Sequence, residues 1–182
     1  MRVITRSTLV LAFIMGAAAC SKPKRPNPIP EPVAREVEGL ANARAVGEDL
    51  LFGAQPTPEA LADLAAQGYR TVLTTRGDGE LQWDEGAVVD SLGMRFVSIP
   101  MPNPLTEIPD AWVEQFDALM RDAERPLLLH CSSGNRVAGL WAVWLAEHQG
   151  VDRAQALELG EKAGMTRIRP LVEKRLGSAG GS

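Results

Sequence analysis

The residues best suited to chemistry in this chain form one short segment that follows an apolar run at 127–129. An apolar pattern with helical spacing begins just after the segment, near Arg136. A loop between a strand and a helix directs backbone N–H groups and the positive end of the helix dipole toward one point, which favours an anion. A cysteine thiolate there suits nucleophilic attack on an oxyanion group such as a phosphate ester. The segment consists of His130, Cys131, Ser132, Ser133, Gly134, Asn135 and Arg136.

The residue types in this loop each have a chemical reason to stand there. Cys131 supplies the nucleophile, and Gly134 lets the backbone bend and approach a ligand closely. Arg136 offers a planar pair of donors that matches two phosphate oxygens, which a lysine does not. His130 is suited to hold the loop from behind, although a histidine satisfied by strand backbone is the alternative. For Cys131 the alternative is a buried structural thiol.

Residues 1–19 have the pattern of an export signal. The stretch begins with Arg2 and Arg6, continues with an apolar run at 9–15 and ends in small residues, and it is too short to span a bilayer. Cys20 directly follows the expected cleavage site, which resembles the lipobox of bacterial lipoproteins. We therefore expect an exported chain whose lipidated Cys20 anchors it to a bacterial membrane, facing the periplasm.

The rest of the chain has the pattern of one domain on a tether. Prolines crowd the start of 20–44, which is expected to be the tether, with a short helix at 33–45 as an option. The alternation of strands and helices predicts an α/β domain at 45–176, with a central, mostly parallel sheet flanked by helices and the Cys131 loop between the central strand and a helix. The tail 177–182 is expected to be disordered. Apolar runs predict strands at 50–53, 71–74, 95–99 and 127–130, and helical spacing predicts helices that include 81–92 and one starting at Asp110.

Composition and charge exclude several classes of protein. The chain has 182 residues, of which 45% are hydrophobic and 23% charged, which is ordinary for a globular domain. A net charge of −4 at pH 7, without a basic stripe, argues against a nucleic-acid partner. Two histidines and two cysteines without paired ligand spacing predict no metal site, and the cysteine chemistry needs no cofactor.

The segment from His130 to Arg136 resembles the signature loop of the cysteine-dependent protein tyrosine and dual-specificity phosphatases. It is most similar to the bacterial phosphatase-like branch related to beta-lactamase hydrolase-like proteins. The resemblance implies a phosphatase-like fold and attack by Cys131 on phosphorus to form a phosphocysteine, with the loop N–H groups and Arg136 holding the phosphate oxygens. The implied substrate is a phosphorylated protein or a small-molecule phosphate ester. Further similar stretches are 52–58, 61–69, 71–76 with Glu80, and 93–100.

Three features depart from the usual pattern of this family. The loop has four residues, rather than five, between its cysteine and its arginine. Val137 stands where a serine or threonine normally helps the thiolate leave. Asn103 stands near the position expected for the aspartic acid that protonates the departing alcohol, so Glu107 and Asp110 become the candidate general acids. Asp110 has an alternative role as the N-cap of a helix.

Two other functions stay open at this point. The short loop also fits a rhodanese-type sulfurtransferase that works through a persulfide on Cys131. Asn103 and Val137 fit an inactive phosphatase fold that only binds phosphorylated or sulfated ligands. Arg76 ends a predicted strand beside the Cys131 strand, so it is a further candidate for the pocket, with a surface position as the alternative.

Overall fold

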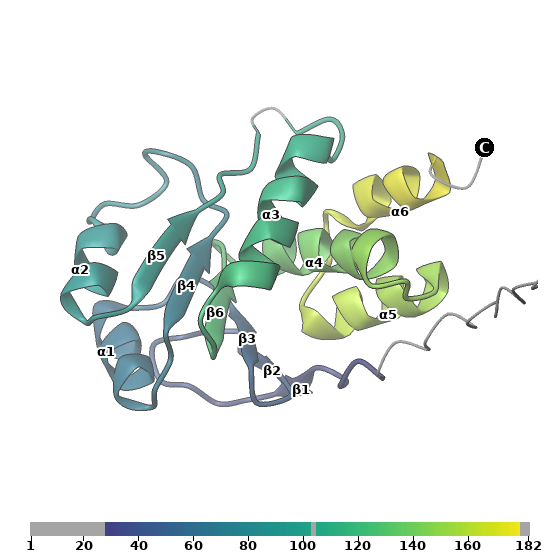
Figure 1. Ribbon diagram of the computed structural model, residues 1–182. Helices are drawn as coiled ribbons and strands as arrows, with labels where there is room; N and C mark the ends of the chain where they lie inside the picture. The colour runs from purple at the N-terminus through teal and green to yellow at the C-terminus, as the bar shows by residue number, and fades with distance from the viewer. Residues whose placement is uncertain (1–27, 103–104, 179–182) are drawn as a thin grey trace, which may run out of the picture.

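A six-stranded sheet with the order β1-β2-β3-β6-β4-β5 forms the centre of the structure (Figure 1). The computed structural model describes residues 28–102 and 105–178. Strands β3, β6, β4 and β5 run parallel to one another, whereas β1 and β2 add an antiparallel edge beside β3. The predicted α/β class with a mostly parallel sheet is confirmed. The strands are β1 (Val33–Ala34), β2 (Arg44–Val46), β3 (Leu50–Gly53), β4 (Thr71–Thr74), β5 (Arg95–Ser98) and β6 (Leu127–His130).

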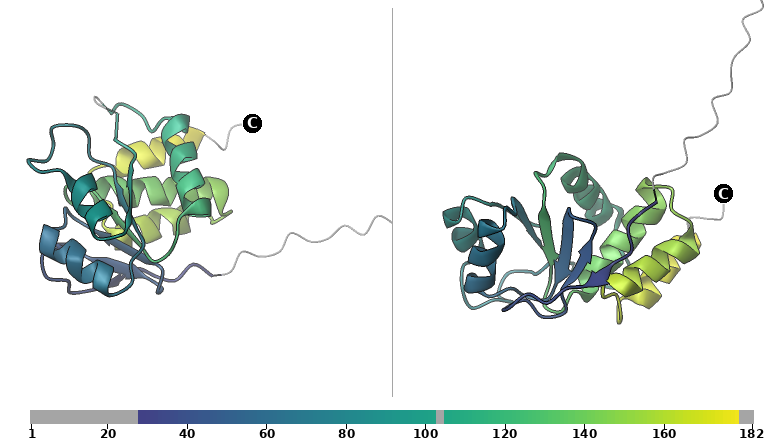
Figure 2. Two further views of the ribbon diagram at one scale, coloured as in Figure 1. Left: turned by 60° about the vertical axis from the view of Figure 1, so that its left-hand side comes forward. Right: turned by 90° about the horizontal axis from the view of Figure 1, so that it is seen from below.

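Helices cover both faces of the sheet, with α1 and α2 on one face and α3 to α6 on the other (Figure 2). In the ranges 28–102 and 105–178, no helix combines the length and the apolar character that crossing a bilayer requires. The helices are α1 (Pro58–Ala66), α2 (Glu85–Ser91), α3 (Asp110–Asp122), α4 (Asn135–His148), α5 (Arg153–Ala163) and α6 (Arg169–Ser178).

Strand β6 lies in the middle of the parallel part and is buried on both faces. Leu127 and Leu129 join the hydrophobic cluster under α3 to α6, while Leu128 joins the cluster under α1 and α2. A continuous apolar run is typical of such a doubly covered strand. At its carboxyl end, His130 is level with Gly53 of β3 and Thr74 of β4. The Cys131 loop therefore starts at the edge where parallel sheets bind ligands.

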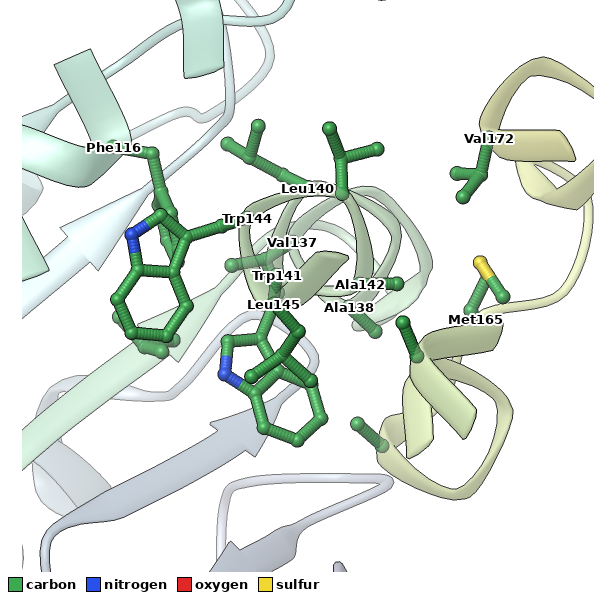
Figure 3. Packing of buried hydrophobic residues seen from close by; sticks show 14 of the residues in the cluster. Phe116, Val137, Ala138, Leu140, Trp141, Ala142, Trp144, Leu145, Met165 and Val172 are labelled. Carbon is green, nitrogen blue, oxygen red and sulfur yellow. The ribbon is translucent and has the colours of Figure 1, made fainter. Parts of the chain in front are cut away.

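Helix α4 is the most deeply buried helix on its side of the sheet, and this fixes the other end of the loop. Trp141 packs against Phe52 with ring centroids 5.0 Å apart. Trp144 meets Phe116 edge-on, with ring centroids 6.0 Å apart (Figure 3). Ala142 faces α5 so closely that a Cβ on Gly160 would lie 2.8 Å from the Ala142 side chain. A helix packed on all sides holds its N-terminus in one place relative to β6.

The fold includes residues that the sequence pattern assigns to the tether. Val33 and Ala34 pair with β2, and Leu40 and Ala43 are buried, so the ordered domain begins before 45 and has no helix at 33–45. At the other end, α6 continues to Ser178, past the predicted limit of 176. Helix α2 is shorter than 81–92, because the Asp84 side chain caps it by accepting from the Ala87 N–H at 2.9 Å.

The predicted export signal lies outside the described residues. Residues 1–19 and the expected lipidation site Cys20 both precede residue 28, and Asn103 falls in the gap at 103–104. Export and lipid attachment therefore stay predictions from the sequence.

Candidate active site

The loop between β6 and α4 closes around the sulfur of Cys131. The backbone N–H of Gly134 donates to Cys131 Sγ at 3.1 Å. Gly134 has a φ of +88°, and a Cβ at this position would lie 3.3 Å from the carbonyl oxygen of Gly53, so both the turn and the close approach to β3 require glycine. Cys131 is fully buried, but it belongs to neither hydrophobic cluster. The groups that contact its sulfur include the Gly134 N–H and the Arg136 guanidinium, which are both polar.

Arg136 extends from the first turn of α4 and is held by a carboxylate. Its Nη1 and Nη2 donate to the two oxygens of Glu80 at 2.8 and 2.6 Å. Nη1 also donates to the Thr75 carbonyl at 3.3 Å, and Nη2 to the Ser132 hydroxyl at 3.1 Å. These bonds occupy the four Nη hydrogens. The Nε–H makes none of these four bonds. A ligand can therefore be held by the Nε–H and by the Nη2 hydrogen that now bonds to Ser132, if the ligand displaces the Ser132 hydroxyl.

The Arg136–Glu80 pair is charged throughout the physiological pH range. Hydrogen bonds from Arg136 lower the pKa of Glu80 from its ordinary 4.5 to about 2; the Gly77 N–H and the Arg76 charge act in the same direction, while burial opposes them. The Glu80 hydrogen bonds likewise raise the pKa of Arg136, and the negative charge of a Cys131 thiolate adds to this effect against burial. The guanidinium therefore lies close enough to the Cys131 sulfur to interact with it.

A chain of polar contacts lies behind the loop, but the His130 ring makes no hydrogen bond to the loop, contrary to the role predicted for it. His130 Nε2 lies 3.1 Å from Glu85 Oε1, without forming a hydrogen bond to it. Gln55 Nε2 donates to the same oxygen at 2.8 Å, and Arg76 Nη1 donates to Gln55 Oε1 at 2.8 Å. Arg76 Nε in turn lies 3.8 Å from Glu80 Oε2. The chain thus connects His130, before the cysteine, with the carboxylate that holds Arg136, after it.

Asn135, a residue of the predicted phosphate-binding loop, has a structural role for its side chain. Its Oδ1 accepts three hydrogen bonds, from Thr166 N at 2.7 Å, Thr166 Oγ1 at 3.0 Å and Ile168 N at 3.2 Å. On the other side of the loop, Asn42 Nδ2 donates to the Ser133 carbonyl at 3.3 Å. These contacts fix the loop to segments that are distant in sequence.

A cleft of about 480 Å³ opens beside Arg136, and neither predicted general acid lines it. Glu107 and Asp110 line a neighbouring cleft, where Asp110 pairs with Arg175 at 2.8 Å. Nor does Asp110 cap α3, because Pro109 occupies the N-cap position. The carboxylate that does line the first cleft is Glu80. With a pKa of about 2, Glu80 is ionised at neutral pH and has no proton to donate.

Among the residues that the structure describes, no three His, Cys, Asp or Glu side chains gather in a group suited to a metal ion. The charged side chains that line the cleft around Arg136 are Glu80, Arg136 and Arg167. The site is therefore organised around a thiol, backbone amides and guanidinium groups.

The Glu80–Arg136 pair predicts a pH dependence of stability. We expect Glu80→Gln to lower the Tm by about 1–3 °C at pH 7, because exposed ion pairs contribute little and the Glu80 side chain is 38% exposed. The pKa of Glu80 is about 2 in the folded protein and near 4.5 in the unfolded chain, so the ionised carboxylate stabilises the fold above pH 4.5. This contribution is lost as the pH falls from 4.5 through about 2. Calorimetric scans should therefore show the Tm difference between wild type and Glu80→Gln narrowing from pH 5 to pH 2.5, because protonation of Glu80 removes the charge that pairs with Arg136.

Glu124→Gln is the matched control, because Glu124 is exposed and makes no ion pair within the described part of the chain. Its Tm difference from the wild type should be small at every pH. A Glu80→Gln difference that stays constant down to pH 2.5 would contradict the assignment of a low pKa to Glu80.

Comparison with known proteins places this site in a family. The sequence pattern described as "Beta-lactamase hydrolase-like protein, phosphatase-like domain" matches residues 42–148, more than half of the chain. A beta-lactamase hydrolase-like protein of Agrobacterium fabrum is 27% identical over 124 residues, which are 65% of this chain and 28% of that protein. This chain thus spans less than a third of that relative. The dual specificity protein phosphatase TpbA of Pseudomonas aeruginosa is 29% identical over 160 residues, 84% of this chain and 68% of TpbA.

Solved structures share the fold. The P. aeruginosa TpbA structure has a TM-score of 0.61 at 24% identity, covering 84% of this chain and 91% of its own. A TpbA cysteine-to-serine variant in complex with pTyr has a TM-score of 0.60 at 25% identity, covering 83% and 97%. A Neisseria meningitidis structure described as a putative phosphatase has a TM-score of 0.59 at 22% identity, covering 76% and 99%. Since the matched residues 42–148 include β3, β4, β6, the Cys131 loop and α4, the chain belongs to the family of beta-lactamase hydrolase-like phosphatase-like domains.

Proposed function

We propose that the chain hydrolyses phosphoric monoesters, in the manner of protein tyrosine and dual-specificity phosphatases, through a phosphocysteine at Cys131. The observation that carries this proposal is the sulfur of Cys131, which accepts the Gly134 N–H at the N-terminus of α4 beside the Arg136 guanidinium. Membership of a phosphatase-like family supports it. The relative TpbA is named a dual specificity phosphatase, and its variant binds pTyr.

In the proposed reaction, the Cys131 thiolate attacks phosphorus, so that an S–P bond forms while the ester P–O bond breaks. The bonding electrons leave with the alcohol oxygen, which takes a proton from water. A second water then attacks the phosphocysteine and releases inorganic phosphate and the thiolate. Loop N–H groups and the Nε and Nη2 hydrogens of Arg136 hold the phosphoryl oxygens in both steps.

The surroundings of the loop favour particular leaving groups. Glu80 is the carboxylate of the cleft and is ionised, so esters whose alcohol needs protonation should react poorly. Aryl esters need less help from an acid than alkyl esters. Val137 follows Arg136 and offers no hydroxyl to the departing sulfur, so hydrolysis of the phosphocysteine should be the slower step.

The decisive experiment is a rapid-quench assay of the purified chain with 4-nitrophenyl phosphate. We expect a burst of nitrophenol equal to the enzyme concentration, followed by slower release of phosphate, and no comparable reaction with an alkyl phosphate. Mass spectrometry of the quenched enzyme should locate the phosphoryl group on Cys131. Thiocyanate formation from thiosulfate and cyanide without phosphate release would instead establish a sulfurtransferase, and pTyr binding without turnover would establish a binding module.

A further inference from the structure

We infer that the cleft beside Arg136 selects aromatic phosphate esters that carry a second anionic group, which Arg167 binds. This inference deepens the proposed phosphatase function and rests on it. Three observations carry it: the position and pairing of Arg167, the rigid connection of its segment to the Cys131 loop, and the balance of charge in the cleft.

Arg167 lines the same cleft as Arg136 and is exposed. It makes no hydrogen bond or ion pair with the residues at 28–102 or 105–178. The arginines that follow it in α6 differ in this respect. Arg169 pairs with Glu161 and Glu173, and Arg175 pairs with Glu147 and Asp110. Arg167 is therefore the guanidinium of this region that has its donors available to a ligand.

The segment that carries Arg167 is fixed to the catalytic loop. Thr166 and Ile168, on either side of it, are both hydrogen-bonded to Asn135 Oδ1. Ile168 also packs so tightly on α4 that a Cβ on Gly139 would lie 2.5 Å from its side chain. The backbone of Arg167 thus has a constant position relative to Cys131, which a specificity contact needs.

The charges in the cleft favour a second anion at Arg167. Glu80 and Arg136 neutralise each other, so among the charged groups lining the cleft Arg167 carries the uncompensated positive charge. The chain as a whole, at −4, gives no general attraction to anions. Apolar side chains of Met101, Leu105 and Leu171 line the same cleft. A phosphoryl group in the loop would leave an aromatic ring against this apolar surface and a distal anion near Arg167.

The test compares two substrates that differ in one charge, 4-(carboxymethyl)phenyl phosphate and its methyl ester, at low ionic strength. We expect the wild type to favour the acid over the ester in kcat/KM by about five-fold, the effect of one partly exposed ion pair. Arg167→Gln should abolish this preference, and Arg167→Lys should keep most of it. Raising the salt concentration to about 0.5 M should reduce the preference of the wild type.

Arg70→Gln is the matched control, because it removes one exposed arginine at the opposite edge of the sheet, before β4. It should leave the preference unchanged; a loss equal to that of Arg167→Gln would attribute the effect to net charge and overturn the inference. Equal rates for acid and ester in an active wild type would also overturn it, while leaving the phosphatase proposal intact. If neither ester is hydrolysed, the phosphatase proposal fails. In that case the preference for the acid over the methyl ester is measured by binding, as the ratio of the Kd values of the two phosphonates that correspond to these esters. Equal Kd values would overturn the role of Arg167.

Discussion

Replacement of Cys131 by serine is expected to lower kcat for 4-nitrophenyl phosphate by at least about 10⁴-fold, as the loss of a nucleophile does in other enzymes that form covalent intermediates. The serine hydroxyl is not ionised at neutral pH and cannot replace the thiolate. The fold should persist, because the serine side chain would fill nearly the same buried volume and could accept the Gly134 N–H that Cys131 Sγ accepts at 3.1 Å. The Kd for phosphotyrosine should therefore stay within about three-fold of the wild type, since the binding groups are unchanged.

The measurement combines steady-state rates, titration calorimetry with phosphotyrosine and thermal unfolding. Cys20→Ser is the matched control, since the chain has two cysteines and the same substitution at the other one should leave kcat unchanged. Residual turnover within about ten-fold of the wild type in Cys131→Ser, confirmed in Cys131→Ala, would show that another group attacks phosphorus.

Much of the fold follows from local sequence, and the exceptions have a common cause. The run at 127–129 is apolar at every position because β6 is covered on both faces, and this makes a buried strand recognisable. Thr57 and Asp152 cap their helices as side chains of this type usually do. The edge strands β1 and β2 have two and three residues, too few for a periodic pattern. They form because β3 offers an unpaired edge, which is a tertiary effect.

The site likewise contains residues that the local sequence identifies and residues that only the tertiary fold brings to it. The loop 130–136 is contiguous, so its residues and their chemistry can be identified from the sequence. Glu85, which faces His130 from a distant part of the sequence, carries no local signal, and Glu80 is indicated only through the family resemblance. The sequence favours Glu107 and Asp110 because they precede a helix near the expected position of an acid. The start of α3 instead contacts Arg175 of α6, so they lie in the neighbouring cleft.

Arg136→Lys is expected to lower kcat/KM for aryl phosphates by about 10²–10³-fold, comparable to the loss of an oxyanion donor elsewhere. A lysine has one cationic nitrogen and cannot hold both Glu80 oxygens and present a second pair of donors to the phosphoryl group. The loss should appear in both kcat and KM. The Tm should change by only a few degrees, because Glu80 is 38% exposed and stays hydrated when its partner is altered.

A double-mutant cycle identifies how Glu80 contributes. If Glu80 acts by orienting the guanidinium, Glu80→Gln alone should lower kcat/KM by about ten-fold, and Glu80→Asp by less. In an Arg136→Ala background the same Glu80→Gln change should have an effect below about two-fold, because the group that it orients is gone. A loss of about ten-fold in that background would mean that the Glu80 carboxylate acts on the substrate directly. The cycle thus shows whether Glu80 positions Arg136 or takes part in the chemistry. The Glu80→Gln variant alone cannot distinguish these two roles.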